Sequence, residues 1–269
     1  MSRQGRRIDE TPDGSGAGVK GHPNEAIRHG ARESMPKYER ILLKLSGESL
    51  AGDGKFGVDS ERLQSLAGEL ADVARAGVQL GLVVGGGNFF RGIHAEARNV
   101  DRVTADHMGM LATVINALAL QDALEQRNLE TRVMTAIQMR QVAEPYIRRR
   151  ALRHLEKGRI AIFAGGTSNP YFSTDTAAAL RALEVKAQLV AKATRVDGVY
   201  DKDPEKHADA RLYEEISYHE VLSQSLRVMD ASAVAMCRDN KLPILVFNLN
   251  VSGNIMRMAM GEPIGTLIH

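Results

Sequence analysis

The stretch Val78-Gln-Leu-Gly-Leu-Val-Val-Gly-Gly-Gly-Asn88 joins a short, mainly apolar run to a loop of three glycines. An apolar run of this length, bounded by turn residues, is typical of a strand buried on both faces of a sheet. The pattern also occurs at 41–45, which leads into Ser46-Gly47, and at 159–164, which leads into Gly165-Gly166. The segments between these runs carry apolar residues at helical spacing. We therefore predict βαβ units and an α/β fold with a mostly parallel sheet.

The remaining elements follow from the same two patterns. Strands are expected at 41–45, 78–84, 131–136, 159–164, 188–193, 243–247 and 265–268. Helices are expected at 59–77, along the face of Met108, Leu111, Ile115 and Leu118, and at 142–156, 174–184, 221–226 and 230–240. By its spacing alone, the face that begins at Met108 is expected to lie in the core, and a role in a subunit interface is the alternative.

Composition excludes several classes of protein. The single cysteine, Cys237, cannot form an internal disulfide or a Cys-rich zinc site, which favours a reducing, cytoplasmic location. The balance of 35 Lys and Arg against 33 Asp and Glu gives no reason to expect a nucleic-acid surface, and Trp is absent. No apolar run approaches the roughly 18 residues of a membrane span, so no membrane contact is expected.

Residues 1–35 differ in composition from the rest of the chain. They are rich in Arg, Gly and Ser and nearly lack apolar residues, so they are expected to form a disordered extension to a catalytic domain at 36–269. No apolar segment follows the arginines, which disfavours a secretory signal. Contact between this basic tail and nucleic acid is the less favoured alternative.

Four predicted strands end in loops that could bind an anion. The loops are Lys44–Gly47, Gly85–Asn88, Gly165–Pro170 and Lys192–Thr194. Ligands of open α/β sheets bind beyond the carboxyl ends of the strands, and glycine lets backbone N–H groups approach a phosphate. A phosphate-rich ligand is therefore the leading hypothesis, and simple tight turns are the alternative.

Known phosphate motifs narrow this hypothesis. The chain has no P-loop sequence, which excludes that class of enzyme. Gly52-Asp-Gly-Lys-Phe-Gly57 matches the glycine pattern of dinucleotide-binding proteins, but it begins several residues after its strand. The dinucleotide fingerprint requires a tight strand–turn–helix unit, so this interpretation is disfavoured.

Three charged residues at these loops are candidates for catalysis. Lys44 and Lys192 each lie near the end of an apolar strand, where they could neutralise a transferring phosphoryl group or simply extend to solvent. Asp175 follows the cap-like pair Ser173-Thr174, so it could orient the lysines or merely stabilise a helix start. Asp106 is expected either to cap a helix or to accept a hydrogen bond from a sugar hydroxyl.

Five motifs in order carry a family resemblance. They are Lys44-Leu-Ser-Gly-Glu48, Gly85-Gly-Gly-Asn-Phe-Phe-Arg-Gly92, Asp106-His-Met-Gly-Met110, Thr167-Ser-Asn-Pro-Tyr-Phe-Ser-Thr-Asp175 and Lys192-Ala-Thr-Arg-Val-Asp-Gly-Val-Tyr200. From about residue 38 onward the chain resembles the bacterial uridylate kinases of the amino-acid-kinase fold. The resemblance implies a three-layer αβα sandwich and transfer of the γ-phosphate of ATP to UMP, giving UDP and ADP in pyrimidine nucleotide biosynthesis.

The resemblance also implies a role for individual residues. The implied catalytic set is Lys44, Asp175 and Lys192. The implied ATP-binding residues are Lys44, Leu45, Ser46, Gly47, Gly87, Arg91, Thr194, Tyr200 and Asp203. The implied UMP-binding residues are Gly86, Asp106, Thr167, Ser168, Asn169, Pro170, Tyr171, Phe172, Ser173 and Thr174. The segment implied in allosteric activation by GTP is Gly52, Asp53, Gly54, Lys55, Phe56 and Gly57.

Partners and cofactors follow from the same resemblance. It implies a homohexamer that GTP activates and UTP inhibits, with Mg²⁺ arriving on ATP and no dedicated protein metal site. The alternatives are a kinase of the same fold acting on an amino acid or carbamate, a nucleotide-sensing module that uses its tail on DNA, and a dinucleotide-dependent oxidoreductase. The UMP-type motifs weigh against the amino acid or carbamate kinase. The near-neutral charge weighs against the DNA-binding module, and the loop geometry weighs against the oxidoreductase.

Overall fold

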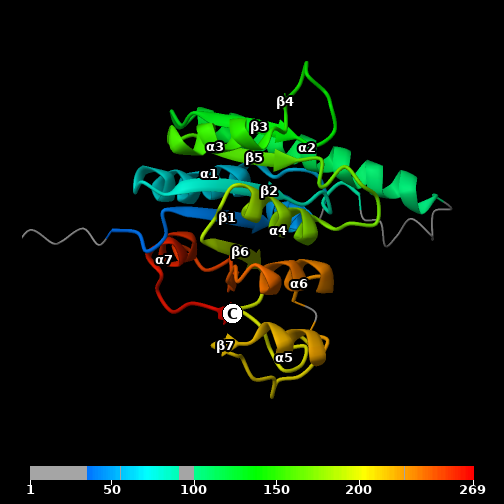
Figure 1. Ribbon diagram of the computed structural model, residues 1–269, viewed down its shortest axis with the longest axis vertical. Helices are drawn as coiled ribbons and strands as arrows, with labels where there is room; N and C mark the ends of the chain where they lie inside the picture. The colour runs from blue at the N-terminus through cyan, green and yellow to red at the C-terminus, as the bar shows by residue number, and fades with distance from the viewer. Residues whose placement is uncertain (1–34, 55, 91–99, 227) are drawn as a thin grey trace, which may run out of the picture. The chain divides into compact units, whose positions relative to one another are not determined.

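A single sheet organises the chain. The computed structural model describes residues 35–54, 56–90, 100–226 and 228–269, and these contain a nine-stranded sheet of order β4-β3-β5-β2-β1-β6-β8-β9-β7 (Figure 1). The strands are β1 (Arg40–Leu45), β2 (Gln79–Val84), β3 (Thr131–Thr135), β4 (Glu144–Pro145), β5 (Ile160–Ala164), β6 (Leu189–Thr194), β7 (Glu215–Ile216), β8 (Ile244–Asn248) and β9 (Thr266–Ile268). All described strand pairs are parallel except β8 with β9.

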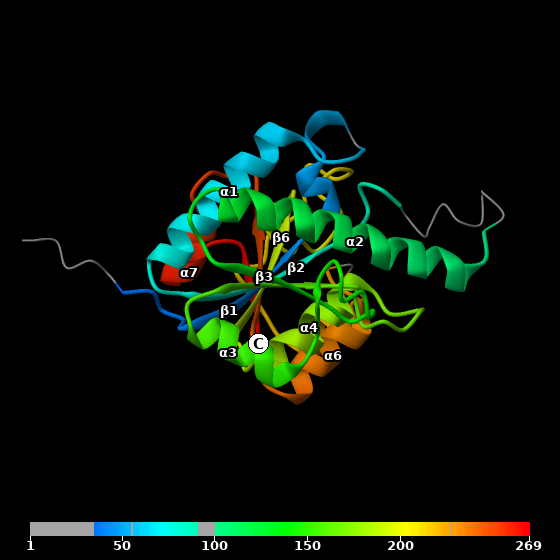
Figure 2. The same cartoon turned by 90° about the horizontal axis from the view of Figure 1, so that it is seen from above.

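Helices cover both faces of this sheet (Figure 2). One face packs against α1 (Ser60–Arg75), α2 (Arg102–Glu125) and α7 (Asn254–Met260). The opposite face packs against α3 (Arg148–Glu156), α4 (Thr174–Glu184), α5 (Tyr218–Ser223) and α6 (Ala231–Asp239). Side chains alternate between these two cores along each strand, so that Leu43 faces α1 and Leu42 faces α4. The predicted α/β fold and its three-layer arrangement are therefore confirmed.

Two predicted helices have different bounds. The predicted helix at 142–156 is wrong in its first half, where the chain forms the short strand β4 before α3 begins at Arg148. Pro145 lacks an N–H and disfavours helical backbone in the residue before it, which explains the break. The predicted helix at 221–226 begins earlier, at Tyr218, because Ser217 and Glu220 form a capping box.

Three further features were not predicted. The sequence patterns do not predict the helix α7 or the strand β7. Asp106 does not cap a helix, because α2 starts at Arg102 and its N-cap is Asp101, whose carboxylate accepts a hydrogen bond from the Thr104 N–H. Asp106 therefore lies within the second turn of α2, with its carboxylate available for other partners.

The outer face of α2 is exposed, so the interpretation from spacing alone, that this face lies in the core, is wrong for most of it, and the interface alternative stays a prediction. Met108, Leu111 and Ile115 are 40%, 48% and 50% exposed, whereas Leu118 packs partly against the core. This helix also has the length and hydropathy of a membrane span, and 44% of its most apolar window is buried in the protein. A helix that covers a sheet with one face and presents an apolar outer face can have this length and hydropathy in a protein that does not span a membrane.

The loop after β2 is pressed against α2. A Cβ on Gly86 would lie 2.5 Å from the Gly109 carbonyl oxygen and 2.8 Å from the Ala112 Cβ. On Gly109 itself, within α2, an added Cβ would meet no atom within 4 Å. The two glycines lie in contact, but the packing excludes a side chain only at residue 86.

Substitution of these glycines should change stability in opposite directions. We expect Gly86→Ala to lower the free energy of unfolding by about 1–3 kcal/mol, because the methyl group overpacks the contact with α2. We expect Gly109→Ala to raise it by about 0.5–1 kcal/mol, because alanine favours a helix interior. Urea denaturation of the two variants measures both effects, and a Gly86→Ala variant as stable as the parent would contradict the close packing.

Candidate functional site

Three charged side chains meet at the carboxyl ends of the central strands. Lys44 of β1 and Lys192 of β6 are register partners in adjacent parallel strands. Asp175 of α4 lies between them, with Lys44 Nζ 2.9 Å from its Oδ1 and Lys192 Nζ 2.7 Å from its Oδ2. The three side chains are only 12–14% exposed, so their charges are poorly screened by solvent. We refer to Lys44, Asp175 and Lys192 as the charge cluster.

Burial and charge determine the protonation of this cluster. Burial alone raises the pKa of Asp175, but Lys44 and Lys192 outweigh it and hold the pKa below its usual value. Burial lowers the pKa of Lys192, and nearby Lys44 lowers it further, although Asp175 opposes both effects. Lys192 also donates a hydrogen bond to the Val228 carbonyl oxygen. Asp175 is therefore an anion at neutral pH, held between the Lys44 and Lys192 side chains.

The start of α4 explains the position of Asp175. Ser173 is the N-cap, and its hydroxyl accepts hydrogen bonds from the N–H groups of Asp175 and Thr176. The predicted N-cap at Ser173 is thus confirmed. This cap places Asp175 in the first turn of the helix, where the helix dipole stabilises a negative charge.

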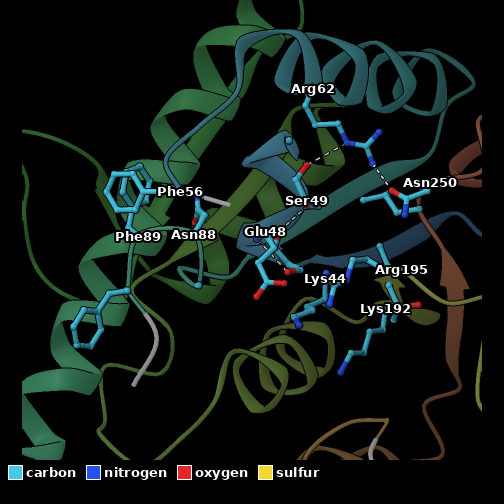
Figure 3. A pocket seen from close by; sticks show the side chains of 17 residues that line it. Lys44, Glu48, Ser49, Phe56, Arg62, Asn88, Phe89, Lys192, Arg195 and Asn250 are labelled. Atoms are coloured by element: carbon cyan, nitrogen blue, oxygen red, sulfur yellow. Dashed lines mark hydrogen bonds between the residues drawn. The ribbon is translucent and has the colours of Figure 1, made fainter. Parts of the chain in front are cut away.

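A cavity of about 970 Å³ opens beside the charge cluster (Figure 3). Lys44, Lys192 and Arg195 lie together on one side of it, and Phe56 and Phe89 lie on the other. We call this cavity, with the following lining, the cationic pocket: Lys44, Ser46, Glu48, Ser49, Gly52, Phe56, Arg62, Gly87, Asn88, Phe89, Phe90, Lys192, Ala193, Thr194, Arg195, Leu249 and Asn250. Its four basic side chains suit a polyanionic ligand.

Arg62 is a basic residue of this pocket that sequence reasoning missed. It projects from α1, and its guanidinium donates to the Ser49 carbonyl oxygen and to Asn250 Oδ1, at 3.3 and 2.9 Å. Nothing local in the sequence distinguishes it from other helical arginines. Arg195 was also missed, although it directly follows the Lys192–Thr194 loop, and this adjacency was an available signal.

A second cavity of about 870 Å³ adjoins the cationic pocket. Its lining includes Gly86, Asp106 and the segment Tyr171–Thr174. We call it the acceptor pocket. Glu48, Gly87 and Phe90 line both cavities, so the two share a wall.

Asp106 organises one side of the acceptor pocket. Its carboxylate accepts a hydrogen bond from the Tyr171 N–H at 2.7 Å and pairs with Arg102 at 2.9 Å. The Arg102 guanidinium also lies over the Tyr171 ring, 5.3 Å from its centre. Tyr171 has a positive φ of 70°, a conformation that is uncommon for a residue with a side chain. Arg102 is a further pocket residue that the sequence analysis did not identify.

Other residues singled out in the sequence lie elsewhere. Tyr200 and Asp203 do not line the cationic pocket; the Tyr200 hydroxyl donates to Asp197, and Asp203 accepts from the Glu205 N–H. Residues 167–170 do not line the acceptor pocket; they precede the segment Tyr171–Thr174, which does. Leu45 and Gly47 are buried behind the pocket wall. Arg91 and Lys55 lie outside the described residues.

Carboxylates are sparse around this site. Within the described ranges, no three His, Cys, Asp or Glu side chains form a group that could hold a metal ion. The charged side chains of the cationic pocket are four bases and Glu48, so a metal ion there needs oxygen ligands that a bound anion can supply.

Comparisons with known proteins agree with this geometry. A UMP kinase from Bacillus anthracis is 42% identical, with a TM-score of 0.84 over 86% of this chain and 96% of that chain. A UMP kinase from Ureaplasma parvum is 36% identical, with a TM-score of 0.81 over 86% and 98% of the two chains. A uridylate kinase from Archaeoglobus fulgidus is 28% identical, with a TM-score of 0.66 over 85% and 99%.

The family match covers eight of the nine described strands and nearly all residues of both pockets. Residues 39–248, from the start of β1 to the end of β8, match the amino acid kinase family. The loops that line the two pockets fall within or just beyond this range. The chain is thus a member of the amino acid kinase family.

Proposed function

We propose that this protein is a UMP kinase, which transfers the γ-phosphate of ATP to UMP and releases UDP and ADP. The observation that carries the proposal is the charge cluster, whose two lysines line the cationic pocket, together with the second cavity that shares a wall with this pocket. The similarity to UMP kinases over 86% of the chain supports the choice of acceptor. In this proposal ATP occupies the cationic pocket and UMP occupies the acceptor pocket.

The chemistry requires little beyond positioning and charge neutralisation. An ionised oxygen of the UMP phosphate attacks the γ-phosphorus of ATP in line, so no strong protein base is needed. Lys44 and Lys192 neutralise charge on the transferring group, and Asp175 holds the two ammonium groups in place. The loop Gly85–Gly87 lies at the wall shared by the pockets, where its backbone N–H groups meet both phosphates.

Residue roles in substrate binding belong to the same proposal. Lys44, Leu45, Ser46 and Gly47 serve the ATP phosphates. Gly87 and Arg91 lie where the phosphates of the two nucleotides meet, and Thr194, Tyr200 and Asp203 serve the nucleoside of ATP. Asp106 accepts hydrogen bonds from the ribose of UMP, and the segment 167–174 surrounds its base and phosphate. Arg62 and Arg195 add positive charge to the ATP side.

Mg²⁺ fits this site as a companion of ATP. The ion would be held mainly by phosphate oxygens and water, with its charge offsetting that of the β- and γ-phosphates. We further propose a cytoplasmic enzyme of pyrimidine nucleotide synthesis, with GTP as activator acting through residues 52–57 and UTP as inhibitor.

Loss of any member of the charge cluster should reduce turnover strongly. We expect Lys44→Ala, Lys192→Ala and Asp175→Asn to lower kcat by about 100–1000-fold, the usual cost of removing an electrostatic stabiliser. A coupled ADP-release assay measures the effect, and circular dichroism checks the fold. Lys157→Ala, an exposed lysine at the end of α3, is the control. A folded Lys44→Ala enzyme with normal turnover would refute the role of the cluster.

The acceptor should be UMP rather than CMP. A pocket that hydrogen-bonds the uracil edge leaves buried groups unpaired when the amino-pyrimidine binds, which can give discrimination of up to about 10⁴-fold. Steady-state kcat/KM values for UMP, CMP, dTMP and acidic amino acids measure this preference. Equal efficiency with UMP and CMP would exclude a UMP-selective enzyme, and turnover only with an amino acid would favour the rival kinase class.

The exposed apolar face of α2 supports a proposal about assembly. Met108, Leu111 and Ile115 form a stripe on one side of the helix, and each is at least 40% exposed. A continuous apolar stripe is typical of a surface that packs against another chain. We propose that this stripe contributes to a homohexamer built from residues 36–269, with residues 1–35 as an extension outside the catalytic domain.

Light scattering tests the assembly. We expect six subunits in both cases: a mass of six times 29.3 kDa for the full chain, and six times its own smaller chain mass for a protein that begins at Met35. Leu111→Glu with Ile115→Glu should give a smaller species, because the charges oppose burial of the stripe. Val251→Glu, at an apolar residue that is 44% exposed elsewhere, should leave the mass unchanged. A monomeric parent protein would contradict the proposal.

A further inference from the structure

Two buried asparagines form a reciprocal amide pair behind the wall shared by the pockets. Asn88 follows the loop Gly85–Gly87, and Asn116 projects from α2; their exposures are 1% and 0%. Asn88 Nδ2 donates to Asn116 Oδ1 at 2.9 Å, and Asn116 Nδ2 donates to Asn88 Oδ1 at 2.7 Å. Such a pair fixes both side chains, because each is at once donor and acceptor to the other.

The second N–H of each amide reaches a separate backbone segment. Asn116 Nδ2 donates to the Gly85 carbonyl oxygen at 2.7 Å, at the start of the glycine loop. Asn88 Nδ2 donates to the Gly57 carbonyl oxygen at 2.7 Å, at the end of the segment that follows the first strand. The pair therefore uses all four of its N–H groups, and through them it joins α2 to two loops of the cationic pocket.

Further contacts strengthen the link to residues 56–57. The Gly57 N–H donates back to the Asn88 carbonyl oxygen at 3.1 Å. The rings of Phe56 and Phe89 meet edge to face, with centres 5.7 Å apart (Figure 3). Residues 56–57 and 88–89 are thus joined by a main-chain hydrogen bond and a ring contact in addition to the bond from Asn88 Nδ2.

The loop after β1 also rests against this pair. A Cβ on Gly47 would lie 2.5 Å from Asn88 Oδ1 and 2.6 Å from the Gly85 carbonyl oxygen. The backbone beside Lys44 can approach the glycine loop only because residue 47 has no side chain. The orientation of Asn88 therefore sets the spacing between the β1 loop and the Gly85–Gly87 loop.

We infer that Asn116 is a positioning residue for phosphoryl transfer: its side chain, through Asn88, holds the Gly85–Gly87 loop and residues 56–57 in register with α2. Asn116 lines neither pocket and acts only through other groups. Its effect on the reaction rests on the proposed UMP kinase function, whereas its effect on the loops does not. Removing it takes the side-chain donor away from the buried Gly85 carbonyl oxygen and leaves Asn88 with only its bond to Gly57.

The central variant is Asn116→Ala, and its matched control is Gln121→Ala. Gln121 lies on the same helix, and its amide donates to the Thr131 carbonyl oxygen and to Glu125, away from both loops. We expect Asn116→Ala to lower kcat by on the order of 100-fold, as misplacement of reacting groups by about 1 Å does. KM for UMP and ATP should change by less than about threefold, and Gln121→Ala should retain normal kinetics.

A double-mutant cycle tests whether the two asparagines act as one unit. If they do, Asn88→Ala combined with Asn116→Ala should cost no more in kcat than the more severe single variant. Multiplicative losses would contradict the inference. If Asn116→Ala does not fold, Asn116→Ser replaces it, since its hydroxyl can satisfy one buried partner and should give an intermediate loss.

Hydrogen exchange supplies a readout that does not depend on catalysis. Peptides covering residues 56–59 and 85–90 should exchange at least tenfold faster in Asn116→Ala than in the parent or in Gln121→Ala. Unchanged exchange there, or equal acceleration in both variants, would overturn the inference. If the parent protein does not phosphorylate UMP, the proposed function fails, but the exchange result still decides the structural role of Asn116.

Discussion

Two lysines side by side in adjacent parallel strands are an unfavourable arrangement, and the site depends on how it is relieved. Lys44 and Lys192 are register partners, so their ammonium groups approach each other across β1 and β6. Asp175 stands between them with one oxygen toward each. A single carboxylate cannot balance two ammonium groups, so the arrangement favours a bound anion. In the proposed reaction that anion is the transferring phosphoryl group.

The helix α2 connects this chemistry to the rest of the molecule. On its inner side, Asn116 donates a hydrogen bond to the Gly85 carbonyl oxygen in the loop after β2. The Thr113 hydroxyl accepts a hydrogen bond from the Gly165 N–H, in the loop after β5, at 2.8 Å. On its outer side, Leu111 and Ile115 are exposed. The same few turns therefore set the loops on both sides of the reacting groups and form the surface proposed for subunit contact.

Much of this fold could be predicted from the sequence, because apolar runs that end in glycine loops mark buried parallel strands. The position of β4 could not be read from periodicity, since Pro145 interrupts a segment whose spacing is otherwise helical. Local pattern indicated Lys44, Lys192 and Asp175 as candidates, since each stands at a strand end or helix start. Arg62 and Asn116 could not be found in this way, because their importance comes from contacts with residues distant in the chain.

The pairing of β1 with β6 has a consequence for how the chain folds. It joins residues 41–44 to residues 189–192, so it closes a long loop and forms slowly relative to local structure. Docking β6 on β1 also brings two ammonium groups together, which opposes the step unless Asp175 is already in place. Because α4 directly precedes β6 in the chain, the two elements can dock on β1 together. Asp175 of α4 then reaches β1 at the same time as Lys192 of β6. Asp175 can thereby offset, as the strands assemble, the same charge repulsion that it offsets in the folded protein.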